Sequence, residues 1–225
     1  MIFNKNKKAQ VVYSFDKNYS FPTSIFADPY PYNTNNHGCP AVHVSNHRLY
    51  AVNGPLDVKF TYNPKTKNVD YVKTSSNTAD KLGKDLFNYI NFTEQDINGV
   101  TTLQAMIPYV FFTDTEGIEL SLLPGTDLDM NNCRFISGSF NIYNWNRTLN
   151  FALEVIDKTK EVTFQWNVDK PFMFIYFNKA VNVNYKLMTD EMWAMCMEVK
   201  NITKLRNNTT KIYNTVLKRR PKNLL

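Results

Sequence analysis

The chain has 225 residues and a mass of 26.2 kDa, and its 43% hydrophobic and 14% aromatic residues exclude a disordered protein because they supply a core. Lys and Arg outnumber Asp and Glu by 26 to 20, but several basic residues lie at the two ends, so nucleic-acid binding is disfavoured. Because no eighteen-residue apolar run or signal-peptide pattern occurs, we expect neither secretion nor membrane crossing.

The first part of the chain is expected to form strands around a proline-rich arm. A β-branched and aromatic run predicts a strand at 10–15, and the Pro- and Tyr-rich stretch at about 16–38 predicts an ordered arm that wraps the domain. Alternation over 56–62, followed by a polar turn and a second run at 69–73, predicts a hairpin. Apolar residues three and four apart predict a short helix at 78–91.

Short β-type segments dominate the rest of the chain as far as residue 188. Leu149, Phe151, Leu153 and Val155 alternate with polar residues, which is typical of a strand with one buried face. Because no helices separate these segments, their pairing should be antiparallel. The expected fold is therefore mainly β, an antiparallel two-sheet sandwich resembling a jelly roll, with strands at 105–112, 118–123, 134–142, 149–156, 161–166, 172–177 and 181–187.

The C-terminal segment has a different pattern. Thr189 followed by two acidic residues is typical of a helix start, and an apolar stripe from Met192 to Val216 predicts an amphipathic helix, whole or in two pieces. We thus expect a sandwich domain at 1–188 and a C-terminal helix at 189–225. The helix would end in a basic tail that we interpret as solvated, with Lys218, Arg219, Arg220 and Lys222.

All three histidines lie close to one cysteine, as weak metal-ligand candidates: His37, Cys39, His43 and His47. An extended segment would keep these side chains apart, and no carboxylate lies nearby, so we expect no metal and no cofactor. Cys39, Cys133 and Cys196 are widely spaced and odd in number. This usage favours free thiols in a reducing compartment.

The most distinctive stretch is 137–151, where Arg147 lies next to Trp145 in a segment rich in small and aromatic residues. A guanidinium can bind carboxylates and stack on rings, so this pair could form a site for an anionic or planar ligand. We favour the alternative in which Arg147 forms an internal ion pair with Asp57 or Asp114, which would lock the corner between two strands. Both readings stay open from the residues alone.

Several short blocks of the chain resemble an uncharacterised protein family of marine tailed phages, the cyanophages with contractile tails. The blocks are Gly38-Cys39-Pro40-Ala41, Gly54-Pro55-Leu56-Asp57-Val58, Tyr109 to Asp114, Leu123-Pro124, Ser137 to Ala152 and Phe174 to Phe177. Family members often have Trp-Phe-Arg-Pro where this chain has Trp145-Asn146-Arg147-Thr148. The resemblance implies a phage origin and a β-rich fold, and it brings no activity, cofactor or catalytic residue.

The leading functional hypothesis is a non-enzymatic phage protein, a virion component or a protein-interaction module, located in the virion or in the host cytoplasm. Protein partners or self-association would involve the final helix, with Met192, Trp193, Cys196 and Val199 at the interface. One alternative is a jelly-roll-type enzyme, with or without a metal, acting in the infected host cell. Another is a carbohydrate-binding domain that displays Tyr143, Trp145 or Trp166.

Overall fold

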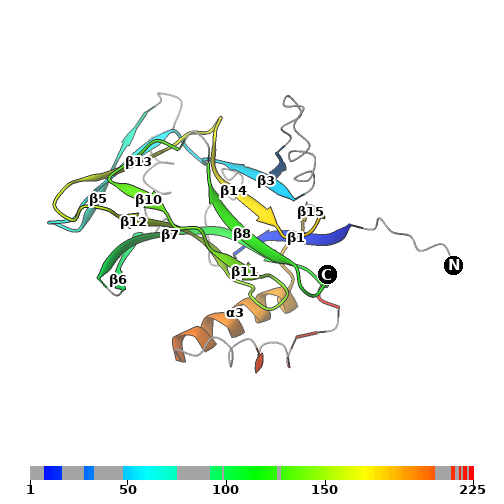
Figure 1. Cartoon of the computed structure of the whole chain (residues 1–225). Helices are drawn as coiled ribbons and strands as arrows, with labels where there is room; N and C mark the ends of the chain where they lie inside the picture. Colours follow the sequence, from blue (N-terminus) through cyan, green and yellow to red (C-terminus); the bar gives the residue numbers. More distant parts are fainter. Residues whose placement is uncertain are drawn as a thin grey trace.

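The computed structural model describes most of the chain, namely residues 8–16, 28–32, 48–74, 92–97, 99–125, 128–205, 214–215, 218, 220–221 and 223–225. The helix predicted at 78–91, most of the arm at 16–38 and the cluster of His37, Cys39, His43 and His47 lie outside the described residues. Within them the protein is mainly β, with one helix, α3 (Asp190–Leu205), as Figure 1 shows. No described helix is long and apolar enough to span a membrane.

The strands in this part of the chain form three sheets. Sheet A has the order β10 (Cys133–Phe135), β12 (Thr148–Val155), β7 (Val100–Phe112), β1 (Ala9–Phe15) and β15 (Val181–Tyr185), and β6 (Phe92–Ile97) also pairs with β7. Sheet B has the order β11 (Ser139–Asn141), β8 (Glu119–Pro124), β14 (Pro171–Phe177), β3 (Leu49–Asn53) and β2 (Tyr30–Pro31). Sheet C has the order β5 (Asn68–Lys73), β4 (Val58–Asn63), β13 (Val162–Trp166) and β9 (Met130–Asn131).

The expected mainly β, antiparallel, sandwich-like fold is confirmed, with two differences in detail. Sheets B and C share one core with sheet A, so the layer facing sheet A is divided into two sheets. In addition, β1 and β15 pair in parallel, from Ala9 opposite Val181 to Tyr13 opposite Tyr185. Local patterns cannot indicate this second feature, because the two strands are separated by most of the domain.

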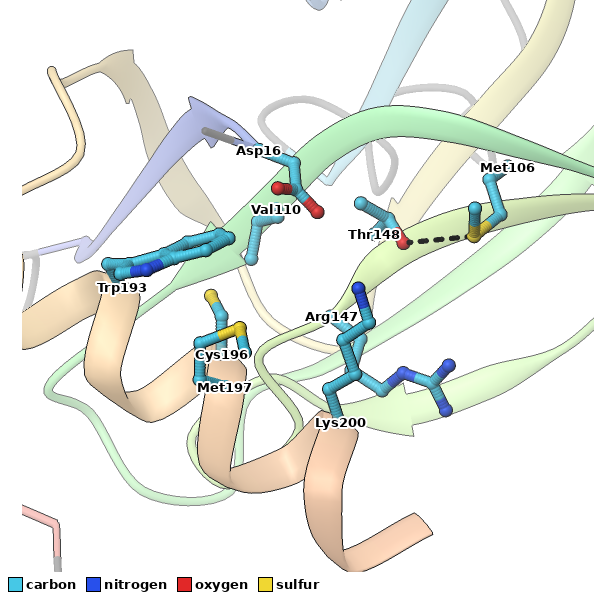
Figure 2. Close-up of a pocket in the computed structure, with 9 residues that line it drawn as sticks. All are labelled: Asp16, Met106, Val110, Arg147, Thr148, Trp193, Cys196, Met197 and Lys200. Atoms are coloured by element: carbon cyan, nitrogen blue, oxygen red, sulfur yellow. Dashed lines mark hydrogen bonds between the residues drawn. The ribbon is translucent and has the colours of Figure 1, made fainter. Parts of the chain in front are cut away.

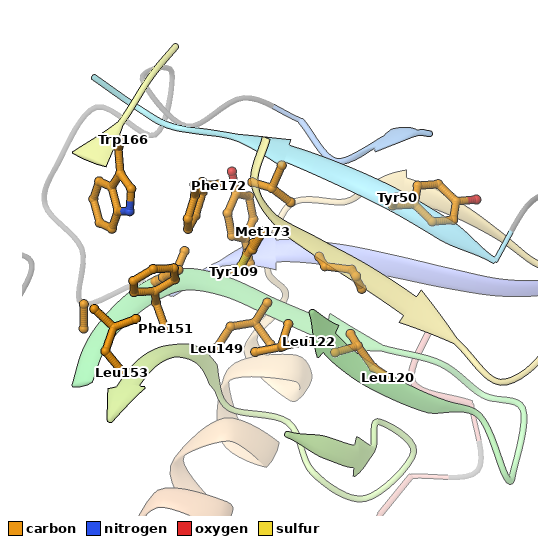
Figure 3. Packing of buried hydrophobic residues seen from close by; sticks show 14 of the residues in the cluster. Tyr50, Tyr109, Leu120, Leu122, Leu149, Phe151, Leu153, Trp166, Phe172 and Met173 are labelled. Carbon is orange, nitrogen blue, oxygen red and sulfur yellow. The ribbon is translucent and has the colours of Figure 1, made fainter. Parts of the chain in front are cut away.

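Aromatic side chains join the three sheets in the core. Phe151 of sheet A lies 5.8 Å from both Phe164 and Trp166 of sheet C and 5.5 Å from Phe172 of sheet B, measured between ring centroids. Phe60 stacks on Phe164 at 4.8 Å. Figure 3 shows Phe151, Trp166 and Phe172 converging between the sheets. Such ring pairs contribute about 0.5–1.5 kcal/mol each beyond their area burial, so they fix the sheets against one another.

Strand β7 is buried on both faces near its end, which explains its long apolar run. Tyr109 and Phe111 face the core between the sheets, whereas Val110 and Phe112 point to the opposite side. On that side they pack against the apolar stripe of α3, which places the helix on the outer face of sheet A (Figure 1). A strand covered twice shows continuous rather than alternating hydrophobicity.

Helix α3 begins as predicted, because the Thr189 hydroxyl accepts a hydrogen bond from the Met192 amide at 3.2 Å. The interface prediction for its stripe requires a correction. Met192, Cys196 and Val199 are buried against Val110 and Phe112 of the protein's own sheet. Trp193, by contrast, is only partly buried. The apolar stripe is therefore buried within the chain at Met192, Cys196 and Val199. Trp193, on the flank of this stripe, is the predicted interface residue that a partner could still contact.

Candidate functional site

The segment between β11 and β12, here called loop 142–147, is fixed to sheet A by a buried asparagine. The side-chain amide of Asn146 donates to the carbonyls of Phe111 and Ile142, both at 3.0 Å. The Tyr143 amide donates to the Asn141 side chain at 2.9 Å, which closes the turn at the start of the loop. Loop 142–147 is thus held by specific side chains, and Trp145 and Arg147 occupy defined positions on it.

A β-bulge follows immediately after this loop. Thr148 pairs with Val110, but Leu149 pairs with Ile107, so the register of β12 shifts between its first two residues. Bulges re-aim side chains and are common beside functional sites. Here the irregular strand start turns residues 147 and 148 toward α3, where both line a cleft.

The cleft lies between sheet A and α3 and has a volume of about 110 Å³. Figure 2 shows Lys200 reaching from the helix toward the strands, with Asp16 and Val110 on the sheet side. The Thr148 hydroxyl contacts the Met106 sulfur at 3.9 Å on one wall. The lining comprises charged, aromatic, sulfur-containing and hydroxyl side chains, namely Asp16, Met106, Val110, Arg147, Thr148, Trp193, Cys196, Met197 and Lys200.

The charges of the cleft are unevenly matched. Arg147 and Lys200 bring two positive charges to it, whereas Asp16 brings one negative charge. Burial lowers the pKa of Arg147, whose guanidinium lies 5.4 Å from the centroid of the Trp145 ring. Burial, with the Asp16 carboxylate as a second cause, raises the pKa of the Cys196 thiol to about 12. The cleft is therefore lined by two basic side chains, one carboxylate and a protonated thiol.

The ion pair predicted between Arg147 and either Asp57 or Asp114 is wrong. Asp57 accepts a hydrogen bond from the Val168 amide at 2.9 Å and so fixes the turn between β13 and β14. Asp114 pairs with Arg220 at 3.0 Å. The four residues named for this site, two for ligand binding and two as ion-pair partners, are thus divided among three places, and only Trp145 and Arg147 lie together. The two aspartates have structural partners.

Arg220 belongs to the C-terminal tail that was expected to be solvated, and this expectation is also wrong for it. Only 2% of its side chain is exposed, because its guanidinium donates to the carbonyls of Tyr143 and Thr113 and lies 4.2 Å from the Tyr143 ring centroid. The backbone amides of Leu224 and Leu225 also donate to Asp114. These contacts form what we call the C-terminal clamp, which ties the chain end to loop 142–147.

The side chains considered for metal binding, thiol chemistry and sugar binding are not exposed as reactive or binding groups in the described part of the chain. The described residues contain no group of three His, Cys, Asp or Glu side chains that could hold a metal ion. Cys133 and Cys196 are free and buried, and burial raises the pKa of Cys133 to about 11. Trp166 is 1% exposed and belongs to the core, so it displays no surface for a sugar. Arginine side chains cover one face of Tyr143 and lie near Trp145.

Most residues of the cleft could not be recognised in the sequence. Asp16 follows β1, Met106 lies in β7, and Lys200 lies in α3, so the cleft is assembled from segments far apart in the chain. Of the residues that line it, Arg147 was indicated beforehand by the unusual composition around it, and Trp193 and Cys196 were indicated by the apolar stripe of the final helix. The chain matches no protein-family model, no curated protein and no solved structure.

Proposed function

We propose that the protein is a non-enzymatic, phage-encoded interaction module associated with the virion, and that its cleft receives an anionic group of a protein partner. The short blocks shared with the phage family support the origin, above all Ser137 to Ala152, which includes loop 142–147. Loop 142–147, the bulge of β12 and α3 support the binding role, because together they hold cationic side chains around one cleft.

The observation that carries this proposal is the environment of Arg147. Its guanidinium is partly withdrawn from water, which lowers its pKa. Arg134 and Arg220, by contrast, have carboxylate partners, Glu154 and Asp114 respectively. Arg147 has the Trp145 ring as its neighbour and pairs with no carboxylate among the described residues. An incoming anion would offset the cost of this partial desolvation.

The chemistry of the cleft favours binding over catalysis. Cys196 is the thiol that lines it, and a pKa of about 12 leaves almost no thiolate at neutral pH, so the thiol is a poor nucleophile.

A metal-dependent enzyme would have to use His37, Cys39, His43 and His47 as ligands, and these lie outside the described residues. Metal analysis of untagged wild type and His43→Ala tests that branch, and stoichiometric metal lost in the variant would favour the enzyme.

The experiment is a comparison of phage particles that carry wild-type protein, Arg147→Met or Arg134→Met. Both variants remove one guanidinium and keep a long apolar side chain, but Arg134 is 69% exposed and pairs with Glu154 away from the cleft. Quantitative mass spectrometry should find the wild type and Arg134→Met in purified particles and much less Arg147→Met at equal expression. Absence of the wild-type protein from particles would contradict the virion assignment, and equal incorporation of all three would contradict the role of the cleft.

A further inference from the structure

We propose that the C-terminal clamp is a conformational latch for loop 142–147. When docked, it holds the loop against sheet A and α3, and when released, it loosens the loop while the sandwich stays folded. The latch regulates the site of the proposed function, because Trp145 and Arg147 lie on this loop, so its effect on binding rests on that function. The polar contacts of Arg220, the burial of Leu224 and the position of both outside the core carry the inference.

Arg220 holds the loop at its first half. Its guanidinium donates to the Tyr143 carbonyl and lies 4.2 Å from the centroid of the Tyr143 ring, so both the backbone and the side chain of this residue are engaged. The same guanidinium donates to the Thr113 carbonyl and lies 3.0 Å from the Asp114 carboxylate, directly after β7. The second half of the loop is fixed by Asn146, whose side-chain amide donates to a carbonyl of β7. Without Arg220 the second half therefore keeps its anchor, and the first half loses its link to the end of β7.

Leu224 joins the clamp to the loop and the helix through apolar contacts. It is 5% exposed and belongs to the cluster under α3 that includes Val110 and Phe112 of β7. Trp145 of the loop and Trp193 of α3 pack against the same cluster. Docking of the clamp therefore completes a packed group that supports both the loop and the helix, which lie on either side of the cleft.

The clamp lies apart from the core between the sheets, so its release does not require the sandwich to unfold. Leu224 and Leu225 pack on the cluster under α3, not on the core cluster that joins the three sheets. Arg220 is also incompletely hydrogen-bonded, because its buried Nε–H has no acceptor in the described part of the chain. An unsatisfied buried donor is unfavourable and offsets part of the energy of docking. Release of the clamp therefore costs less than global unfolding.

Native-state hydrogen exchange of the full ¹⁵N-labelled chain, followed by NMR, measures the release of the loop. The Trp145 amide, which donates to the Asn141 carbonyl at 3.0 Å, reports opening of the loop. The Phe177 amide, which donates to the Arg48 carbonyl at 2.8 Å, reports opening of the core. Arg220→Met should speed exchange at Trp145 about tenfold or more, because charge-assisted hydrogen bonds to the loop are lost. Arg220→Lys keeps the charge but not the fork of donors, so its effect should be smaller and in the same direction.

Gly125→Ala is the control for a general loss of stability. Its methyl group would lie 1.9 Å from the Pro171 carbonyl oxygen, and neither residue belongs to the clamp, so it weakens the contact of β14 with β8 instead. Exchange at Phe177 should become faster in this variant, and exchange at Trp145 should stay at the wild-type rate. Faster exchange at both amides in Gly125→Ala would overturn the latch, because the loop would then open only with the whole domain. Wild-type exchange at Trp145 in both Arg220 variants would overturn it too.

A titration with sodium acetate at about pH 6.5, where acetate is ionised, tests the coupling of the latch to binding. The indole N–H of Trp193, which lines the cleft, reports the bound acetate in the NMR spectrum. We expect a saturable shift in the wild type and in Gly125→Ala. The apparent Kd should be about threefold higher or more in Arg220→Met, because the released loop is then the main form. Arg220 does not itself line the cleft, so loss of a direct contact does not explain such a change.

The outcomes separate the latch from the anion site. Equal Kd values for the wild type and Arg220→Met, with faster exchange at Trp145 in the variant, would show that the loop does not control the site. That result overturns the regulation and leaves the site standing. No saturable shift of Trp193 in the wild type would overturn the proposed anion site, and the exchange rates alone would then decide whether the latch exists.

Discussion

At the scale of single residues, two arginines, Arg147 and Arg220, have opposite environments. Arg220 is enclosed by carbonyl groups, a carboxylate and the Tyr143 ring, so its hydrogen bonds hold the chain end in place. Arg147 lies at a cleft near Trp145 and is engaged by no described carboxylate. The first residue is accordingly suited to stability and the second to binding.

Replacing Arg220 should be the most destabilising of the arginine substitutions. Arg220→Met leaves the carbonyls of Thr113 and Tyr143 and the Asp114 carboxylate without their charged partner, which should lower the free energy of unfolding by about 3 kcal/mol. Arg134→Met breaks an exposed pair with Glu154 that solvent screens, so it should cost much less stability than Arg220→Met. Urea denaturation measures both values. Equal losses for the two variants would show that the C-terminal clamp does not stabilise the fold.

Asp157 gives the pH dependence expected of a single carboxylate. Its carboxylate accepts hydrogen bonds from the Thr159 hydroxyl and amide and forms an ion pair with Lys160. These contacts, the Thr159 hydroxyl above all, lower the pKa of Asp157 to about 2. Because the folded pKa lies below the unfolded value, its contribution is complete above about pH 5 and disappears as the pH falls to about 2. Urea denaturation across this range should show the stability difference between wild type and Asp157→Asn shrinking toward low pH. A constant difference would mean that the folded carboxylate has an ordinary pKa.

At the scale of elements, the positions of strands depend on close backbone contacts as much as on apolar patterns. Gly125 follows β8 and donates its amide to the Phe172 carbonyl of β14 at 3.1 Å. A methyl group at this glycine would lie 1.9 Å from the Pro171 carbonyl oxygen. Strand β14 can therefore approach the end of β8 only because residue 125 has no side chain.

Two glycine substitutions test this contact. Gly125→Ala should lower the free energy of unfolding by at least about 2 kcal/mol, because backbone atoms rather than a movable side chain occupy the space. Gly138→Ala is the matched control, since nothing lies within 4 Å of its added methyl group, and its effect should stay within about 1 kcal/mol. Thermal and urea unfolding measure both. A Gly125→Ala protein as stable as the control would contradict the described approach of β14 to β8.

The sequence predicted the elements whose apolar residues have a clear period. The alternation in β4 and β12 and the stripe of α3 were recognised, because one face of each is buried. Strand β6 was missed because its residues are largely polar and it pairs along β7 through backbone groups. Strand β3 was missed because Tyr50, Ala51 and Val52 are buried consecutively and show no alternation. The spacing of apolar residues alone does not reveal a strand that is buried on both faces or on neither face.

At the scale of the whole molecule, the boundary between sheet A and α3 provides a defined place where a ligand group can enter. The core between the sheets is filled by aromatic side chains, whereas the boundary between sheet A and α3 contains the cleft (Figures 2 and 3). Its residues come from β7, β12, α3, loop 142–147 and the chain after β1. Composition around residue 147 could indicate an unusual surface, but the charge balance of the cleft depends on tertiary structure and could not be predicted.

The most direct measurement of the central claim is a crystal structure of the full chain grown in sodium acetate, compared with crystals of Arg147→Met from the same solution. The account predicts electron density for one acetate in the cleft of the wild type, with its oxygens within hydrogen-bonding distance of Arg147 and its methyl group toward Trp193, and none in the variant. A cleft that stays closed by an Arg147 ion pair within the chain, or that holds the anion equally well without Arg147, would contradict it.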